Sequence, residues 1–130
     1  MKTILVDAVD TFDVEIDGTY QVFQEMYELL ETFPNRKILL TGANDEQFRL
    51  WHLDKMPYEV FTLKHNPDKT DPKYFETLLA RNELNRDEVV YFEHNPEAVK
   101  SSEAVGIKTF LYDPNDGNLV TLKEFLTKNL

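Results

Sequence analysis

The sequence predicts an α/β protein with a doubly wound, three-layer α/β/α Rossmann-like fold and a five-stranded parallel sheet. Short apolar runs alternate with segments of helical spacing along the 130 residues, which is the pattern of repeated strand and helix units. The runs Thr3–Val6 and Val89–Phe92 have almost no polar interruption, as expected of strands buried on both faces of a parallel sheet. We therefore predict a single domain over residues 1–130, without a linker or a repeat.

The first half of the chain predicts three strands and two helices. After the strand Thr3–Val6, the polar segment Asp13–Gly18 indicates a flap or a tight hairpin. From Tyr20 to Phe33, apolar residues recur at helical spacing, and Pro34 ends the predicted helix. The next elements are a strand at 37–40, a helix at 45–53 with Phe48, Trp51 and His52 facing inward, and a strand at 58–63.

The second half contains two helix starts in which aspartate or asparagine precedes proline. Asp71-Pro72 and Asn95-Pro96 each offer a capping side chain and then a proline at the first helical position. Gly106 is the expected end of the second of these helices, and Thr121 is the expected cap of a last one. The remaining predictions are strands at 87–92 and 107–112 and a surface turn at 113–117.

The composition argues against several classes of protein. A net charge of -10 disfavours nucleic acid and anionic membrane as partners, because both are polyanions. The chain has no cysteine, which excludes disulfides, thiolate metal sites and a cysteine nucleophile. No apolar run approaches the ~20 residues of a membrane span, and the apolar run at the N-terminus is too short for a signal peptide. We expect a cytoplasmic protein.

Polar side chains follow the ends of four predicted strands. Because the carboxyl ends of parallel strands meet at one edge of a sheet, these groups are expected to face a common crevice. Carboxylate, hydroxyl, ammonium and imidazole groups together are the set that phosphoryl transfer uses. Taken singly, each is also compatible with a turn, a helix cap or a solvated charge. The residues are Asp7, Asp10, Thr41, Lys69, Glu93 and His94.

These polar residues and the segments around them occur in an order that resembles the haloacid dehalogenase-like (HAD) superfamily of phosphohydrolases. The resemblance covers nearly the whole chain. The first family motif is an apolar strand that ends in a nucleophilic aspartate, and the later motifs supply a threonine or serine, a lysine before a helix, and acidic residues after a strand. The similar segments here are Ile4–Phe12, Ile38–Gly42, Lys69–Pro72, Phe92–Pro96 and Ala104–Ile107.

The resemblance implies roles for particular residues. It implies that Asp7 is the nucleophile and that Thr41, Gly42 and Lys69 bind phosphate. It also implies a magnesium site with the side chain of Asp7 and the main-chain carbonyl of Val9 as ligands. Further magnesium ligands would come from the fourth motif, at Glu93 and His94.

Two positions depart from the family pattern. Val9 stands where the family has the aspartate that acts as general acid and base. Asp10 follows it, and only a local bulge would bring its side chain to the site. His94 stands where the family has a magnesium-binding aspartate, and imidazole is a poor ligand for this hard cation. With Glu93 as the remaining oxygen ligand, we expect a magnesium site that is weakened or lost.

These departures leave two functions open. The first is a HAD-like domain with a degraded phosphohydrolase site and little or no catalysis, retained to bind phosphate, another ligand or a partner protein. The second is an active magnesium-dependent phosphatase, with Asp7 as nucleophile and Asp10 or His94 as an unconventional acid–base group. We favour the first, because two catalytic positions are changed.

A two-component receiver domain is a third interpretation, but it needs an aspartate after the third strand, where Leu63-Lys64-His65 offers none. Without room for a cap domain, the crevice should be open, which suits a macromolecular substrate or a phosphorylated ligand or partner. We expect a monomer or a homodimer.

Overall fold

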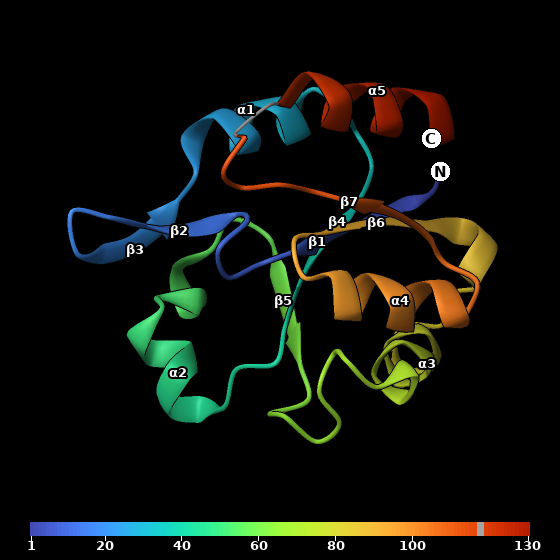
Figure 1. Ribbon diagram of the computed structural model, residues 1–130, viewed down its shortest axis with the longest axis horizontal. Coiled ribbons are helices and arrows are strands. Elements are labelled where there is room, and N and C mark those ends of the chain that lie inside the picture. The colour runs from blue at the N-terminus through green and yellow to red at the C-terminus, as the bar shows by residue number, and fades with distance from the viewer. Residues whose placement is uncertain (117–118) are drawn as a thin grey trace.

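A five-stranded parallel sheet forms the centre of the computed structural model, which describes residues 1–116 and 119–130 (Figure 1). The strands lie in the order β5-β4-β1-β6-β7, so that β1 is central, and each neighbouring pair is parallel. The predicted fold class is confirmed. The strands of the sheet are β1 Thr3–Asp7, β4 Lys37–Thr41, β5 Glu59–Thr62, β6 Val89–Glu93 and β7 Lys108–Leu111.

Helices cover both faces of this sheet. In Figure 1, α1 and α5 lie above it, whereas α3 and α4 lie below. The helices are α1 Gln24–Glu31, α2 Asp45–Leu50, α3 Pro72–Arg81, α4 Pro96–Ala104 and α5 Leu119–Asn129, with 3-10 turns at Leu53–Lys55 and Arg86–Glu88. The predicted caps of α3 and α4 are confirmed, because the side chains of Asp71 and Asn95 each accept a backbone N–H bond from two residues further on. Within the described residues, every helix is too short or too polar to serve as a membrane span.

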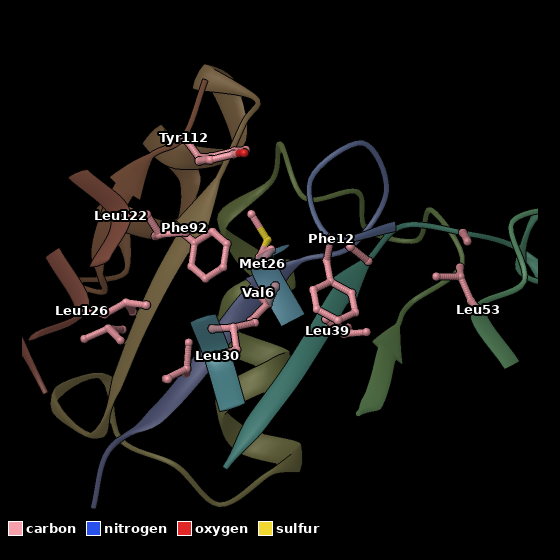
Figure 2. Close-up of a cluster of buried hydrophobic side chains, with 14 residues drawn as sticks. Val6, Phe12, Met26, Leu30, Leu39, Leu53, Phe92, Tyr112, Leu122 and Leu126 are labelled. Carbon is pink, nitrogen blue, oxygen red and sulfur yellow. The ribbon is translucent and has the colours of Figure 1, made fainter. Parts of the chain in front are cut away.

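Two hydrophobic layers hold β1 in place. All five of its residues are buried, and they alternate between the two faces of the sheet. Ile4 and Val6 pack in the layer of α1 and α5, and Leu5 packs in the layer of α3. Figure 2 shows side chains of both helices of the first layer gathered around Val6 and Phe92. Packing on both faces therefore fixes the position of Asp7, the residue after Val6, at the carboxyl edge of the sheet.

A β-hairpin follows β1, and it corrects one prediction. Strands β2 (Asp13–Ile16) and β3 (Thr19–Val22) pair antiparallel, so the hairpin expected from the polar segment is present. The helix predicted from Tyr20 is wrong in its first part, because Tyr20 lies on β3 and α1 begins at Gln24. Asp17 and Gly18 both have positive φ, at 53° and 82°, which a tight hairpin turn requires. Pairing across that turn overrides the helical spacing.

Two further boundaries differ from the sequence prediction. The second helix ends at Leu50 rather than at residue 53, because His52 adopts a left-handed backbone with φ 53° and a separate 3-10 turn follows. Thr121 lies inside α5, which begins at Leu119, so its predicted role as the cap is wrong. The surface turn predicted at 113–117 ends at Gly117, which lies outside the described residues.

Candidate active site

A small cavity lies where the carboxyl ends of β1, β4 and β6 meet. Its volume is about 190 Å³, below the roughly 300–1,000 Å³ of a typical small-molecule pocket. The cavity therefore has room for one small polar group. Every residue that the sequence nominates for the site lines it, namely Asp7, Val9, Asp10, Thr41, Gly42, Lys69, Glu93 and His94.

Asp7 is the last residue of β1, and both of its carboxylate oxygens are engaged by the chain. Its Oδ1 accepts a hydrogen bond from Lys69 Nζ at 2.6 Å, and its Oδ2 accepts one from Thr11 Oγ1 at 2.7 Å. Oδ2 also accepts from the ring Nδ1 and the backbone N–H of His94. The side chain is nearly fully buried. Burial raises the pKa of Asp7, and the charge of Lys69 opposes that rise.

Lys69 joins Asp7 to a second buried carboxylate. Its Nζ lies 2.6 Å from Asp7 Oδ1 and 2.7 Å from Glu93 Oε1. The Tyr91 hydroxyl also donates to Glu93 Oε1, and the Asn95 backbone N–H donates to Oε2 at 3.1 Å. Burial alone would raise the pKa of Glu93, but the charge of Lys69 and the side-chain contacts with His94, Asp7 and Lys69 outweigh it and hold that pKa well below its usual range. Glu93 is therefore an ionised group.

His94 brings a second cation to the same carboxylates. Its Nδ1 bonds to Asp7 Oδ2 and lies 3.3 Å from Glu93 Oε2. The hydrogen bonds to Asp7 and then to Glu93 raise the pKa of His94 to about 10, although burial acts against them. The imidazole is therefore protonated at neutral pH. Two carboxylates and two cations offset one another at the end of β1.

Val9, at the position where the resemblance implies an acid–base aspartate, has no titratable group. Val9 is half-buried and lines the cavity with an isopropyl group. Asp10, the next residue, is exposed and has a left-handed backbone with φ 69°. Its carboxylate accepts a hydrogen bond from the Tyr20 hydroxyl on the hairpin at 3.3 Å. Among the described residues, no hydrogen bond joins Asp10 to Asp7 or His94.

Comparison with known proteins identifies the fold. No family model matches the sequence, and no curated protein matches it significantly. Among solved structures, a HAD family enzyme from Bacteroides thetaiotaomicron, a mutant in complex with magnesium and inorganic phosphate, matches with a TM-score of 0.73 at 10% identity. That match covers 94% of this chain and 98% of the other. The chain has a HAD-like fold.

Two further solved structures match the same fold. A hydrolase from Streptococcus pneumoniae matches with a TM-score of 0.64 at 19% identity over 83% of this chain and 58% of the other. The core domain of a protein from the same species, provisionally assigned as a phosphoglycolate phosphatase, matches with a TM-score of 0.61 at 15% identity. This match covers 99% of the present chain and 96% of the matched core domain. Similarity of structure at such low identity establishes the fold alone.

Among the described residues, one cluster at this cavity has groups that could hold a metal ion. One ligand atom each from Asp7, Glu93 and His94 lie within 4.8 Å of one another. Their carboxylate oxygens already accept hydrogen bonds from Lys69, Thr11 and the donors described above. A metal ion would therefore compete with the chain's own donors for the same oxygens.

On the β4 side of the cavity lie the hydroxyl of Thr41 and the backbone of Gly42. Thr41 Oγ1 accepts from the Ala43 N–H at 3.1 Å, which leaves its hydroxyl proton to donate elsewhere. The Tyr74 hydroxyl donates a hydrogen bond to the Thr41 backbone carbonyl at 2.7 Å. A Cβ on Gly42 would come within 3.3 Å of His65 Nδ1, so glycine allows the His65 ring to lie against this backbone.

Four residues that line the cavity are not predicted from the sequence, namely Ala43, Trp51, His65 and Asn95. His65 follows β5, and the rule that selected the other strand ends would have found it. Its Nδ1 lies 2.6 Å from Asp68 Oδ1, and its Nε2 lies 2.6 Å from Gln47 Oε1. Trp51 and Asn95 also line the cavity. No sequence signal separates this tryptophan from a core residue.

Asp13, at the start of β2, is expected to make stability depend on pH. It is fully buried, and neither of its carboxylate oxygens has a hydrogen-bond partner among the described residues. Burial raises its pKa to about 7, while nearby His52 lowers it and Asp10 raises it. The folded state therefore binds a proton more tightly than the unfolded state. It follows that this group's contribution to the free energy of unfolding is greatest below about pH 4 and is lost as the pH rises to about 7.

Urea unfolding of the wild type and of Asp13→Asn across this pH range checks the expectation. The difference in stability between the two proteins should shift in favour of the variant as the pH rises. The exposed Asp17→Asn should track the wild type. A constant difference between wild type and Asp13→Asn would show that Asp13 does not titrate in this range.

Proposed function

We propose that this HAD-like chain has little or no phosphatase activity and is retained as a phosphate- or ligand-binding domain. The state of Asp7 carries the proposal. Lys69, Thr11 and His94 hold both of its oxygens, whereas a nucleophile needs one oxygen free to face phosphorus. Val9 offers no proton to a leaving group and no base to activate water. Together these features remove two requirements of turnover.

The cavity supports a small oxoanion as ligand. Lys69, His94 and the Thr41 hydroxyl are donors that line it, and its volume of about 190 Å³ admits a phosphoryl group without the molecule that bears it. A phosphorylated ligand or partner protein would insert its phosphate and leave the remainder outside. We expect modest affinity, because Asp7 and Glu93 already offset the two cations.

Magnesium does not fit this donor set well. The ion prefers oxygen ligands, and here the oxygens of Asp7 and Glu93 bond to Lys69 and to other donors of the chain. The protonated ring of His94 adds a repelling charge beside them. We therefore propose that the magnesium site of the fold is weakened or lost in this chain.

An active magnesium-dependent phosphatase is the second candidate. One observation favours it: Asp7 ends the central strand with Lys69 Nζ at 2.6 Å, where a nucleophile and a phosphate-binding lysine would stand. Displacement of His94 by magnesium would be needed before Asp7 could react. Activity that depends on both magnesium and Asp7 would distinguish this candidate.

Calorimetric titration of the wild type with magnesium chloride and, separately, with sodium tungstate tests the proposal. We expect tungstate to bind without magnesium and magnesium alone to give no saturable heat. Thr41→Val should weaken tungstate binding about tenfold or more, since a hydrogen bond to a charged group contributes about 1.5–3 kcal/mol. The exposed Thr127→Val is the matched control and should bind as the wild type does.

Hydrolysis of an activated phosphate ester is measured in parallel. The proposal is wrong if the wild type turns the ester over with magnesium and Asp7→Asn abolishes that turnover while remaining folded. If neither magnesium nor tungstate binds, the crevice is not a phosphate site, and the fold would serve as a scaffold for a partner protein.

A further inference from the structure

One side of the cavity at the carboxyl edge of the sheet is apolar. Val9, Ala43 and Trp51 line the cavity, and all three pack with the hydrophobic layer of α1 and α5. Ala43 is buried, whereas Val9 and Trp51 are half-buried. The cavity therefore meets the methyl groups of a valine and the indole of a tryptophan on this side.

The charged groups of the cavity lie on the opposite side. Leu5 and Tyr91 pack in the layer of α3, and the side chains of Asp7 and Glu93, each two residues further along the same strand, point the same way. Lys69 Nζ lies between these two carboxylates and 3.5 Å from the Tyr91 hydroxyl. An oxoanion held by Lys69 would thus have the apolar side as its other neighbour.

Tyr20 extends the apolar side toward the mouth of the cavity. Its ring lies 6.0 Å from the ring of Trp51, centroid to centroid, with a tilt of 49° between the planes. Its hydroxyl donates to Asp10, an exposed residue that lines the cavity and so marks the mouth. The hairpin that carries Tyr20 and the helix α2 before Trp51 lie on the same side of the molecule (Figure 1). A group attached to a bound phosphate would leave the cavity beside these rings.

We propose that the ligand of this cavity is an aryl phosphate, a phosphate ester whose bridging oxygen is attached directly to an aromatic ring. The inference rests on the proposed phosphate-binding function and names the group that the phosphate carries. The phosphate would face Lys69 and the Thr41 hydroxyl, and the ring would lie against Val9 and Trp51 at the mouth. The side chain of phosphotyrosine and a free phenyl phosphate share this chemistry.

The apolar side disfavours other kinds of phosphate ester. The hydroxyls of a sugar phosphate would lose water against a valine and an indole without gaining hydrogen bonds there. A short alkyl phosphate, such as the side chain of phosphoserine, would cover little of the indole. In an aryl phosphate, one oxygen separates phosphorus from the ring, so the ring reaches the apolar side as soon as the phosphate is bound. Contact between aromatic rings then adds to the effect of the buried area.

Calorimetric titration with sodium tungstate, phenyl phosphate and ethyl phosphate, all without magnesium, tests the proposal. We expect phenyl phosphate to bind at least about fivefold more tightly than ethyl phosphate, since only the former buries a ring against Trp51. Trp51→Leu should remove most of this preference and leave the affinity for tungstate unchanged, and Trp51→Phe should restore most of it. Phe125→Leu removes a ring from the same hydrophobic layer outside the cavity, and this matched control should keep the full preference.

Tungstate separates failure of this inference from failure of the proposed function. If tungstate binds the wild type while phenyl and ethyl phosphate bind equally, the inference is wrong and the phosphate site stands. This comparison uses the wild type alone and so does not depend on how any variant folds. Full preference in a folded Trp51→Leu variant would also overturn the inference. If neither tungstate nor phenyl phosphate binds, both proposals are wrong.

Two peptides identify the source of the ring. A phosphotyrosyl peptide and its phosphoseryl counterpart, with glycine on both sides of the phosphorylated residue, are compared with phenyl phosphate. Stronger binding of the phosphotyrosyl peptide than of phenyl phosphate supports the proposal with a protein as ligand, and the reverse order supports it with a small molecule as ligand. A phosphoseryl peptide that binds as tightly as the phosphotyrosyl peptide would contradict it.

Discussion

A Val9→Asp/His94→Asp variant is expected to hydrolyse an activated phosphate ester about 10²–10⁴-fold faster than the wild type in the presence of magnesium. The Val9 side chain already lines the cavity, so an aspartate there would face the reacting groups. Removal of the His94 ring frees Asp7 Oδ2, and the new carboxylate supplies the oxygen ligand that magnesium prefers. Initial rates of p-nitrophenyl phosphate hydrolysis across a magnesium titration measure the gain.

Two controls make this result interpretable. Val9→Asn/His94→Asn has similar side-chain volumes without the carboxylates, and it should be as inactive as the wild type. Addition of Asp7→Asn to the active variant should remove the new rate, since Asp7 is then the nucleophile. A double variant that binds magnesium and stays inactive would show that the site lacks more than these two groups.

Lys69→Met is expected to lower the free energy of unfolding by about 3–5 kcal/mol, the usual cost of breaking a buried ion pair from one side. Lys69 is 16% exposed and is the shared partner of Asp7 and Glu93, which are both nearly fully buried. Its loss leaves two carboxylates close together without the ammonium group between them. Urea unfolding followed by far-UV circular dichroism measures the change.

Lys73→Met, on the exposed side of α3, is the matched control and should change stability by less than about 0.5 kcal/mol. Lys69→Met/Glu93→Gln should recover part of the loss, because His94 still faces Asp7 and the double variant removes the buried negative charge that Lys69 no longer offsets. If Lys69→Met is no worse than Lys73→Met, the ion pairs at the end of β1 contribute nothing to stability.

The strand ends are the part of the site that sequence reasoning located. Buried apolar runs predicted which segments form the parallel sheet, and the geometry of such a sheet brings their carboxyl ends to one edge. Asp7, Thr41 and Glu93 therefore line one cavity although the chain separates them widely. The order of strands and helices alone brings these residues together, and the sequence shows that order directly.

The direction of each side chain could not be predicted in the same way. The contact of His94 Nδ1 with Asp7 joins residues 87 positions apart, and it depends on a ring rotation that no spacing encodes. Tyr91 looks like any core tyrosine until its hydroxyl is placed on Glu93. The predicted start of α1 is wrong because the spacing of Tyr20 fits a helix. The turn at Asp17 and Gly18 instead pairs Tyr20 with β2 in a hairpin.

The chain contains a built-in optical reporter. Its single tryptophan, Trp51, lines the cavity, and the ring of Tyr20 on the β2–β3 hairpin lies 6.0 Å from it, centroid to centroid. Tyr20 also bonds to Asp10 at the cavity rim. A ligand bound in the cavity, or a movement of the hairpin, would change the environment of the Trp51 indole. Emission from the unlabelled protein can therefore follow events at the end of β1 in real time.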